Sequence, residues 1–121
     1  MVLTEKRGTG FHVVSEANGK RSRDAITILS GEVLEVGAVI GKITASGKYI
    51  ETDPDAVDGS EVAAGVLYAA VDATDGDVAG VAHLRDCEVY KAELNYISTA
   101  DAGEILTMDA ELLAVGIVAR T

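Results

Sequence analysis

The chain is a succession of short apolar runs of β type, each closed by turn residues. Thirteen glycines and a single proline punctuate these runs. Helical patterns of about 10–15 residues do not separate them, which argues against a doubly wound parallel sheet. The pattern therefore predicts a mainly β domain, with strands over residues 25–29, 38–44, 48–51, 78–84 and 87–90.

One pair of these strands predicts a hairpin. The runs 38–44 and 48–51 flank Ala45-Ser46-Gly47, with the glycine at the position that requires a positive φ. The longest apolar run, 61–71, contains Gly65 and is rich in valine, which favours a buried, bulged strand over a helix. Residues 53–60 form an acidic loop and 72–77 a turn.

The last quarter of the chain predicts a short helical segment. Ser98 and Asp101 have the spacing of a helix start, and apolar residues then recur near helical spacing to residue 115. Gly103 and Thr107 leave open whether this is one helix or two short pieces. Gly116 predicts its end, and residues 117–119 predict a final strand.

Charge divides the chain into two parts. The formal net charge is -10, yet residues 1–24 hold five basic and three acidic residues. This first part also holds an isolated apolar patch, formed by Phe11, His12, Val13 and Val14. We predict that residues 1–24 form an extended arm, disordered alone, and that 25–121 form the compact domain. The patch would add a strand to the sheet edge of a partner, and Asn18-Gly19 would form a tight turn.

The composition excludes several classes of protein. Twenty acidic residues against ten basic ones argue against binding to nucleic acid or to an anionic membrane. No apolar run is long enough to span a bilayer, and no signal peptide is evident. The single cysteine, Cys87, excludes an internal disulfide framework and predicts a buried thiol. A hydrophobic content of 48% with few aromatic residues predicts apolar surface between subunits.

No motif predicts catalysis or a cofactor. The glycine-rich stretch 41–48 has the wrong spacing for a phosphate-binding loop, and the acidic loop at 53–59 has the wrong spacing for an EF-hand. No serine lies in a Gly-x-Ser-x-Gly elbow. His12 and His83 lie in strand-like runs, where packed or exposed imidazoles are common. We therefore expect no enzymatic activity, no cofactor, no metal and no small-molecule substrate.

Several segments of the chain resemble the head decoration protein D family of lambda-like phages and prophages. The most specific are FHVVSEANGKRSRD at 11–24 and GAVIGKITASGKY at 37–49. Residues 64–67, 82–89 and 112–120 also resemble that family.

The resemblance implies a β-clip type fold and a homotrimer. It implies binding to the outer surface of the expanded capsid at local three-fold positions, where the trimer clamps the major capsid protein after DNA packaging. The capsid-contacting arm would correspond to Phe11, His12, Val13 and Val14. It further implies a place on the virion exterior, reached from the host cytoplasm during assembly, and neither cofactor nor catalytic residue.

A different class remains as the alternative, a small non-catalytic β module that binds a glycan or another small ligand. In that interpretation the hairpin at 41–50 forms a platform together with the tyrosines Tyr49, Tyr68, Tyr90 and Tyr96.

Overall fold

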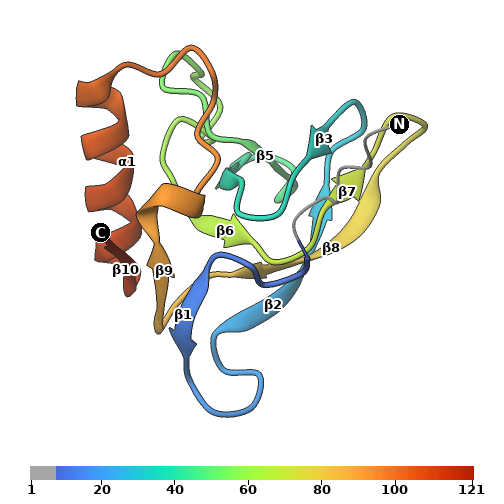
Figure 1. Ribbon diagram of the computed structural model, residues 1–121. Coiled ribbons are helices and arrows are strands. Elements are labelled where there is room, and N and C mark those ends of the chain that lie inside the picture. The colour runs from blue at the N-terminus through green and yellow to red at the C-terminus, as the bar shows by residue number, and fades with distance from the viewer. Residues whose placement is uncertain (1–7) are drawn as a thin grey trace, which may run out of the picture.

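The computed structural model describes residues 8–121, and its centre is a small closed β-barrel (Figure 1). The strands follow the order β2 (Arg23–Ile28), β5 (Tyr49–Glu51), β4 (Val39–Lys42), β6 (Gly65–Leu67) and β8 (Val78–His83). β2 pairs antiparallel with β8 along its whole length. Its other side meets β5 through the single parallel pair Ile28↔Tyr49, so the barrel closes over one residue pair.

A second sheet and the helix lie beside the barrel. β9 (Cys87–Tyr90) is the central strand of this sheet, with β1 (Val13–Glu16) antiparallel on one side and β10 (Ile117–Arg120) parallel on the other. The helix α1 (Ala102–Ala114) runs along this sheet (Figure 1), and a 3-10 turn, η1 (Lys91–Glu93), follows β9. β3 (Val33–Leu34) and β7 (Val71–Asp72) form a separate small ribbon.

The core is aliphatic and has two parts. The first fills the barrel and contains the fully buried Ile28, Ile40 and Leu67. The second lies between the barrel wall, the second sheet and α1, and contains Met108, Leu112 and Ile117. Chain folding removes these side chains from water, which is the main favourable contribution to stability in a domain of this size.

Much of the strand pattern is confirmed, including the mainly β class with one short C-terminal helix. β4 and β5 form the expected antiparallel hairpin, with Gly47 at φ +73°. The apolar run 61–71 contains a buried strand, but only over Gly65–Leu67. Gly65 lies against β8, where a Cβ would stand 2.5 Å from the Leu84 side chain and 2.7 Å from the His83 carbonyl oxygen. The β-clip assignment stays a prediction.

The helix is a single piece and begins later than Ser98 suggested. Asp101 is its N-cap: the Asp101 carboxylate accepts a hydrogen bond from the Glu104 amide, and the Glu104 carboxylate accepts one from the Asp101 amide. This reciprocal capping box satisfies two amide donors that the first turn leaves unpaired. Gly116, at φ +87°, ends the helix as expected. Within residues 8–121, no helix is both long and apolar enough to cross a membrane.

The expectation that the arm lacks a partner in its own chain is wrong for residues 8–24. β1 pairs with β9, and Arg23 and Asp24 already belong to β2. The physical reason is that β9 has a second edge to satisfy and that His12 fills a buried space beside the barrel. Asn18-Gly19 does form a turn, with Gly19 at φ +68°. Residues 1–7 of the expected arm lie outside the described residues.

β4 packs closely against the loop between β5 and β6, and this packing leads to a first prediction. A Cβ on Gly41 would stand 2.3 Å from the Ser60 carbonyl oxygen, which belongs to rigid backbone. We expect Gly41→Ala to lower the free energy of unfolding in urea by about 2 kcal/mol or more. Gly8→Ala is the control, because nothing lies within 4 Å of its added Cβ, and it should change stability by less than about 0.5 kcal/mol. Equal stability of the two variants would contradict the packing described for β4.

Candidate functional site

β1 is an edge strand with apolar side chains on its surface. It hydrogen-bonds to β9 on one side, and among the described residues no strand pairs with its other side. Phe11, just before the strand, is 54% exposed, and Val14 is 40% exposed. The register shifts between Val13 and Ser15, so Val14 is the extra residue of a β-bulge. A bulge commonly re-aims a side chain, and this one leaves Val14 at the surface.

The stretch before β1 is fastened by backbone contacts. The Gly10 amide donates to the Tyr68 carbonyl oxygen at 2.9 Å, and the His12 carbonyl oxygen accepts from the Tyr90 amide at 2.8 Å. Gly10 has φ +73°, and a Cβ at this position would stand 3.0 Å from the Tyr68 ring. A larger residue would therefore be both strained and crowded at this point.

Glu16, at the end of β1, ties the strand to the barrel. Arg23 of β2 donates from Nε to Glu16 Oε2 at 3.0 Å and from Nη2 to Oε1 at 2.6 Å. His83 of β8 places Nε2 2.5 Å from the same Oε2. The hydrogen bonds from Arg23 first, and from His83 second, hold the pKa of Glu16 below its ordinary value. The Arg23 guanidinium also lies 4.4 Å above the centre of the Tyr68 ring.

His12 is the buried part of the same cluster. Its ring packs edge-on against that of His83, with centroids 5.8 Å apart. Both ring nitrogens of His12 lack a hydrogen-bond partner among the described residues. Burial, and then the neighbouring His83, lower the pKa of His12 from 6.5 to about 4. The imidazole is therefore neutral at neutral pH, because a charge in this position would be poorly solvated.

A row of polar groups crosses the outer face of the second sheet. Ser15 Oγ donates to Glu88 Oε2 at 2.6 Å, and Arg120 Nε donates to Glu88 Oε1 at 2.6 Å. These hydrogen bonds hold the pKa of Glu88 below its ordinary value. The row joins all three strands, so β1, β9 and β10 form one connected unit at the surface.

The structure does not assemble a metal or thiol site from the candidate residues. Within residues 8–121, no three His, Cys, Asp or Glu side chains gather as metal ligands. Cys87 is buried as expected, and burial raises the pKa of its thiol to about 12. His12 and His83 do meet, which the sequence did not reveal, since 70 intervening residues separate two similar strand-like runs.

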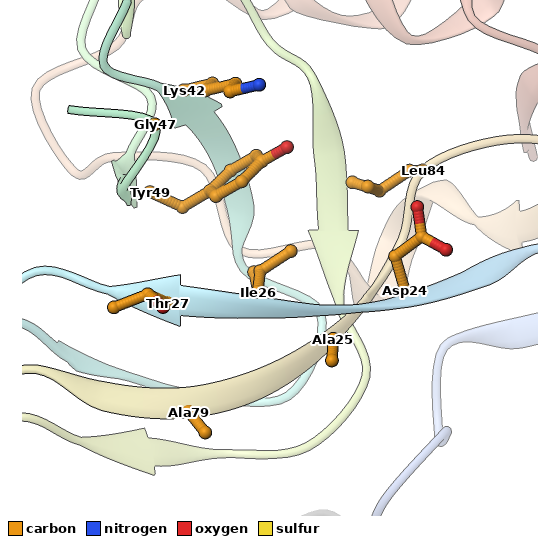
Figure 2. A pocket seen from close by; sticks show the side chains of 9 residues that line it. All are labelled: Asp24, Ala25, Ile26, Thr27, Lys42, Gly47, Tyr49, Ala79 and Leu84. Carbon is orange, nitrogen blue, oxygen red and sulfur yellow. The ribbon is translucent and has the colours of Figure 1, made fainter. Parts of the chain in front are cut away.

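The tyrosines of the alternative interpretation do not form one platform. Tyr49 is buried at the wall of a hollow of about 460 Å³ beside β2, near Lys42 and Asp24 (Figure 2). Tyr68 packs under Arg23, and Tyr96 donates a hydrogen bond to Asp109 of α1. Tyr90 is exposed on β9. Four separate environments leave no shared surface on which a sugar ring could stack.

The comparison with protein families decides between these interpretations. The family model described as bacteriophage lambda head decoration protein D matches residues 2–117. The chain belongs to this family. A search of the curated proteins found no match. Membership of the head decoration family makes the chain a structural component of a phage head, located in the virion capsid, and the matched region includes all of β1.

The four residues expected to contact the capsid have different positions in this head decoration fold. Phe11 and Val14 are exposed at the surface. Val13 is half-buried and pairs with Val89 of β9. His12 is fully buried. His12 therefore packs inside the protein and helps to position β1, whereas the side chains of Phe11 and Val14 lie at the surface, where a partner protein could touch them.

The buried His12 predicts a specific pH dependence of stability. Its folded pKa, about 4, lies below the ordinary 6.5, so the unfolded state binds more protons between these values. The stability gained by keeping His12 neutral is fully present above pH 6.5 and is lost as the pH falls toward 4. We expect His12→Leu to reduce the loss of unfolding free energy across this window by on the order of 2 kcal/mol. The measurement is urea denaturation at a series of pH values.

Glu16 affects only the acid end of this window, because its pKa is held below its ordinary value of 4.5 and the stability it contributes is lost only as the pH falls below about 4.5. The comparison is therefore made between pH 6.5 and 5. A stability that falls between pH 6.5 and 5 as steeply in His12→Leu as in the unaltered protein would contradict the assignment.

The contacts of Glu16 predict that it keeps β1 closed against β9. Glu16→Ala removes the acceptor of both Arg23 and His83. We expect the β1 amides that bond to β9 to exchange hydrogen about tenfold to a hundredfold faster, which corresponds to losing a charged hydrogen-bond network. Asp24→Ala is the matched control, since it removes the Asp24–Arg85 ion pair elsewhere on β2. Unchanged β1 exchange in Glu16→Ala would show that the strand is held by other contacts.

Proposed function

We propose that this protein is a head decoration protein that binds as trimers to the outer surface of the expanded phage capsid, at local three-fold positions. Its partner is the major capsid protein, and binding stabilises the shell after DNA packaging has enlarged it. The protein reaches the virion exterior from the host cytoplasm during assembly. Family membership supports the head location, and the open edge of β1 supports the mode of contact.

The open edge of β1 carries the proposal. An edge strand presents unpaired amide and carbonyl groups, and an extended segment of another protein can pair with them. Phe11 and Val14 would then bury apolar surface against the capsid protein. The strand is held in place by His12, Val13 and Glu16. Because the edge is ordered before the capsid protein binds, binding loses little conformational entropy in β1.

Charge near this edge supports a partner with an acidic rim. Lys20 and Arg21 are exposed in the loop that connects β1 and β2. Arg21 Nε lies 3.4 Å from Asp86 Oδ2, and both side chains are exposed. Such a surface ion pair contributes little to stability, so the Arg21 guanidinium stays accessible to a partner. The rest of the chain carries the acidic excess, so this loop is the part suited to a negatively charged surface.

Stabilisation of the capsid by a bound trimer would require only non-covalent contacts with the major capsid protein. A trimer presents three copies of the β1 edge, and when the first has docked the other two bind at high effective concentration. Each contact can be weak, yet the trimer leaves the shell only when all three are broken, and while it stays bound it links neighbouring capsid subunits. A cement protein acts by adding this interface free energy to the shell.

The experiment compares binding of two matched variants to expanded empty capsids by co-sedimentation. Val14→Asp places a charge at the exposed bulge of β1, and Val33→Asp places one at an exposed valine of β3, which lies on the other side of the molecule (Figure 1). We expect Val14→Asp to weaken binding at least about tenfold, because a carboxylate would be buried unpaired. Val33→Asp should bind like the unaltered protein.

Thermal unfolding of both variants shows that the fold is intact. Deleting residues 1–20 is a poorer test, because it also removes His12 and Glu16 from the interior contacts. Undiminished binding of Val14→Asp to capsids that the unaltered protein decorates would contradict the proposed contact.

A further inference from the structure

The barrel leaves one edge of β2 open. Within residues 8–121, β2 pairs with β8 along its whole length, yet it meets β5 only at Ile28. The backbone groups of successive residues in a strand point alternately to its two sides. The Leu29 amide donates to the Tyr49 carbonyl oxygen at 3.1 Å on the β5 side, so Ala25, four residues earlier, turns its amide and carbonyl the same way. No strand of the described chain pairs with Ala25 on that side.

The hollow of about 460 Å³ lies along this open edge (Figure 2). Residues of β2 form one wall, and Lys42 and Tyr49 of the β4–β5 hairpin form the other. A second hollow, of about 270 Å³, shares Asp24 and Ala25 with the first and is lined in addition by Lys20. The two hollows follow the strand, so their joint shape suits an extended segment better than a compact small molecule.

Tyr49 brings an unused hydrogen-bond donor into the hollow. The residue is only 8% exposed, and no hydrogen bond within residues 8–121 involves its hydroxyl. Figure 2 shows this hydroxyl pointing toward the same space as the Lys42 ammonium group. Burial, and then the nearby Asp24, raise the pKa of Tyr49 above its ordinary value, so the hydroxyl keeps its proton and can donate. A donor held in this way favours an acceptor that enters the hollow.

The charges of the hollow favour a carboxylate as that acceptor. Within the described part of the chain, neither Lys42 nor Lys20 has a carboxylate at ion-pair distance. Asp24, the acidic residue of the lining, is already engaged, because Arg85 Nη2 donates to its Oδ2 at 2.5 Å. An ammonium group and a hydroxyl on one wall can together bind a carboxylate. The formal net charge of -10 repels an acidic segment from most of the surface, so these cations would direct it to this edge.

We propose that an extended acidic segment of another protein binds along the open edge of β2. The backbone of this segment pairs with Ala25 and Thr27, as an added strand does. One aspartate or glutamate side chain of the segment accepts hydrogen bonds from Lys42 Nζ and the Tyr49 hydroxyl. The inference does not rest on the proposed function, because neither the trimer nor the capsid enters the argument and the residues differ from those of the β1 edge.

Titration of the nitrogen-15-labelled protein with synthetic peptides, followed by NMR, tests the inference. The first peptide is about seven residues long, alternates threonine and valine, and carries one central glutamate. We expect it to shift the amide signals of Ala25 and Thr27. The matched peptide with glutamine in place of glutamate should bind at least about fivefold more weakly. The glutamate peptide with N-methylated backbone amides should not bind, because it cannot pair with the strand edge.

Two protein variants locate the receptor for the carboxylate. Tyr49→Phe removes the hydroxyl and keeps the ring, and Lys42→Gln removes the charge. Each should weaken binding of the glutamate peptide about fivefold and leave binding of the glutamine peptide unchanged, which also shows that the fold is intact. Lys48→Gln is the matched control, because Lys48 lies in the same hairpin but pairs with Asp77 and does not line the hollow. It should bind both peptides like the unaltered protein.

Three results would overturn the inference. The first is no shift at Ala25 and Thr27 with the glutamate peptide at roughly millimolar concentration. The second is equal binding of the glutamate and glutamine peptides. The third is a response to sodium acetate alone that matches the response to the peptide, which would assign the hollow to small carboxylates. Capsids are absent from this experiment, so its failure would leave the proposed function standing.

Discussion

The carboxylate of Glu16 is the contact on which the arrangement of this molecule depends. Three hydrogen bonds, two from Arg23 and one shared with His83, join the end of β1 to two neighbouring barrel strands. Without them, β1 would be a short edge strand held by its ladder with β9, the Ser15–Glu88 hydrogen bond and the Gly10–Tyr68 backbone hydrogen bond before it. His83 of the same cluster packs edge-on against the buried His12, one residue after the exposed Phe11. The half-buried Glu16–Arg23 pair thus fastens the strand whose bulge carries the exposed Val14.

The sequence predicted those parts of the fold that local patterns specify. The turn at Gly47, the strand Cys87–Tyr90 and the helix end at Gly116 follow from residue types whose backbone preferences are strong. The start of α1 lies three residues beyond Ser98, because Ser98 and Asp101 can each cap a helix and Asp101 forms the reciprocal capping box with Glu104.

The pairing of the arm cannot be predicted from local sequence, for a different reason. A short apolar patch among glycines and basic residues has no local signature that distinguishes a free strand from a paired one. Its pairing depends on β9, which lies about seventy residues further along the chain, and on Glu16 meeting His83 across a similar separation. The sequence gives Phe11, His12, Val13 and Val14 one shared role, and it shows neither the burial of His12 nor the bulge that leaves Val14 exposed.

The open edge of β1 lies on a body with a large acidic excess. Several carboxylates of that body are held by specific partners such as Tyr96, Arg120 and Arg85. A strand edge of this kind suits an extended segment of a different protein.

The most direct test is the structure of a capsid decorated with this protein, determined by electron cryomicroscopy. The account predicts that a segment of the major capsid protein runs along the outer edge of β1, hydrogen-bonded to its backbone, with Val14 covered and Glu16 still bonded to Arg23 and His83. A decorated capsid in which the outer edge of β1 faces solvent, with the capsid protein contacting other parts of the barrel, would contradict it.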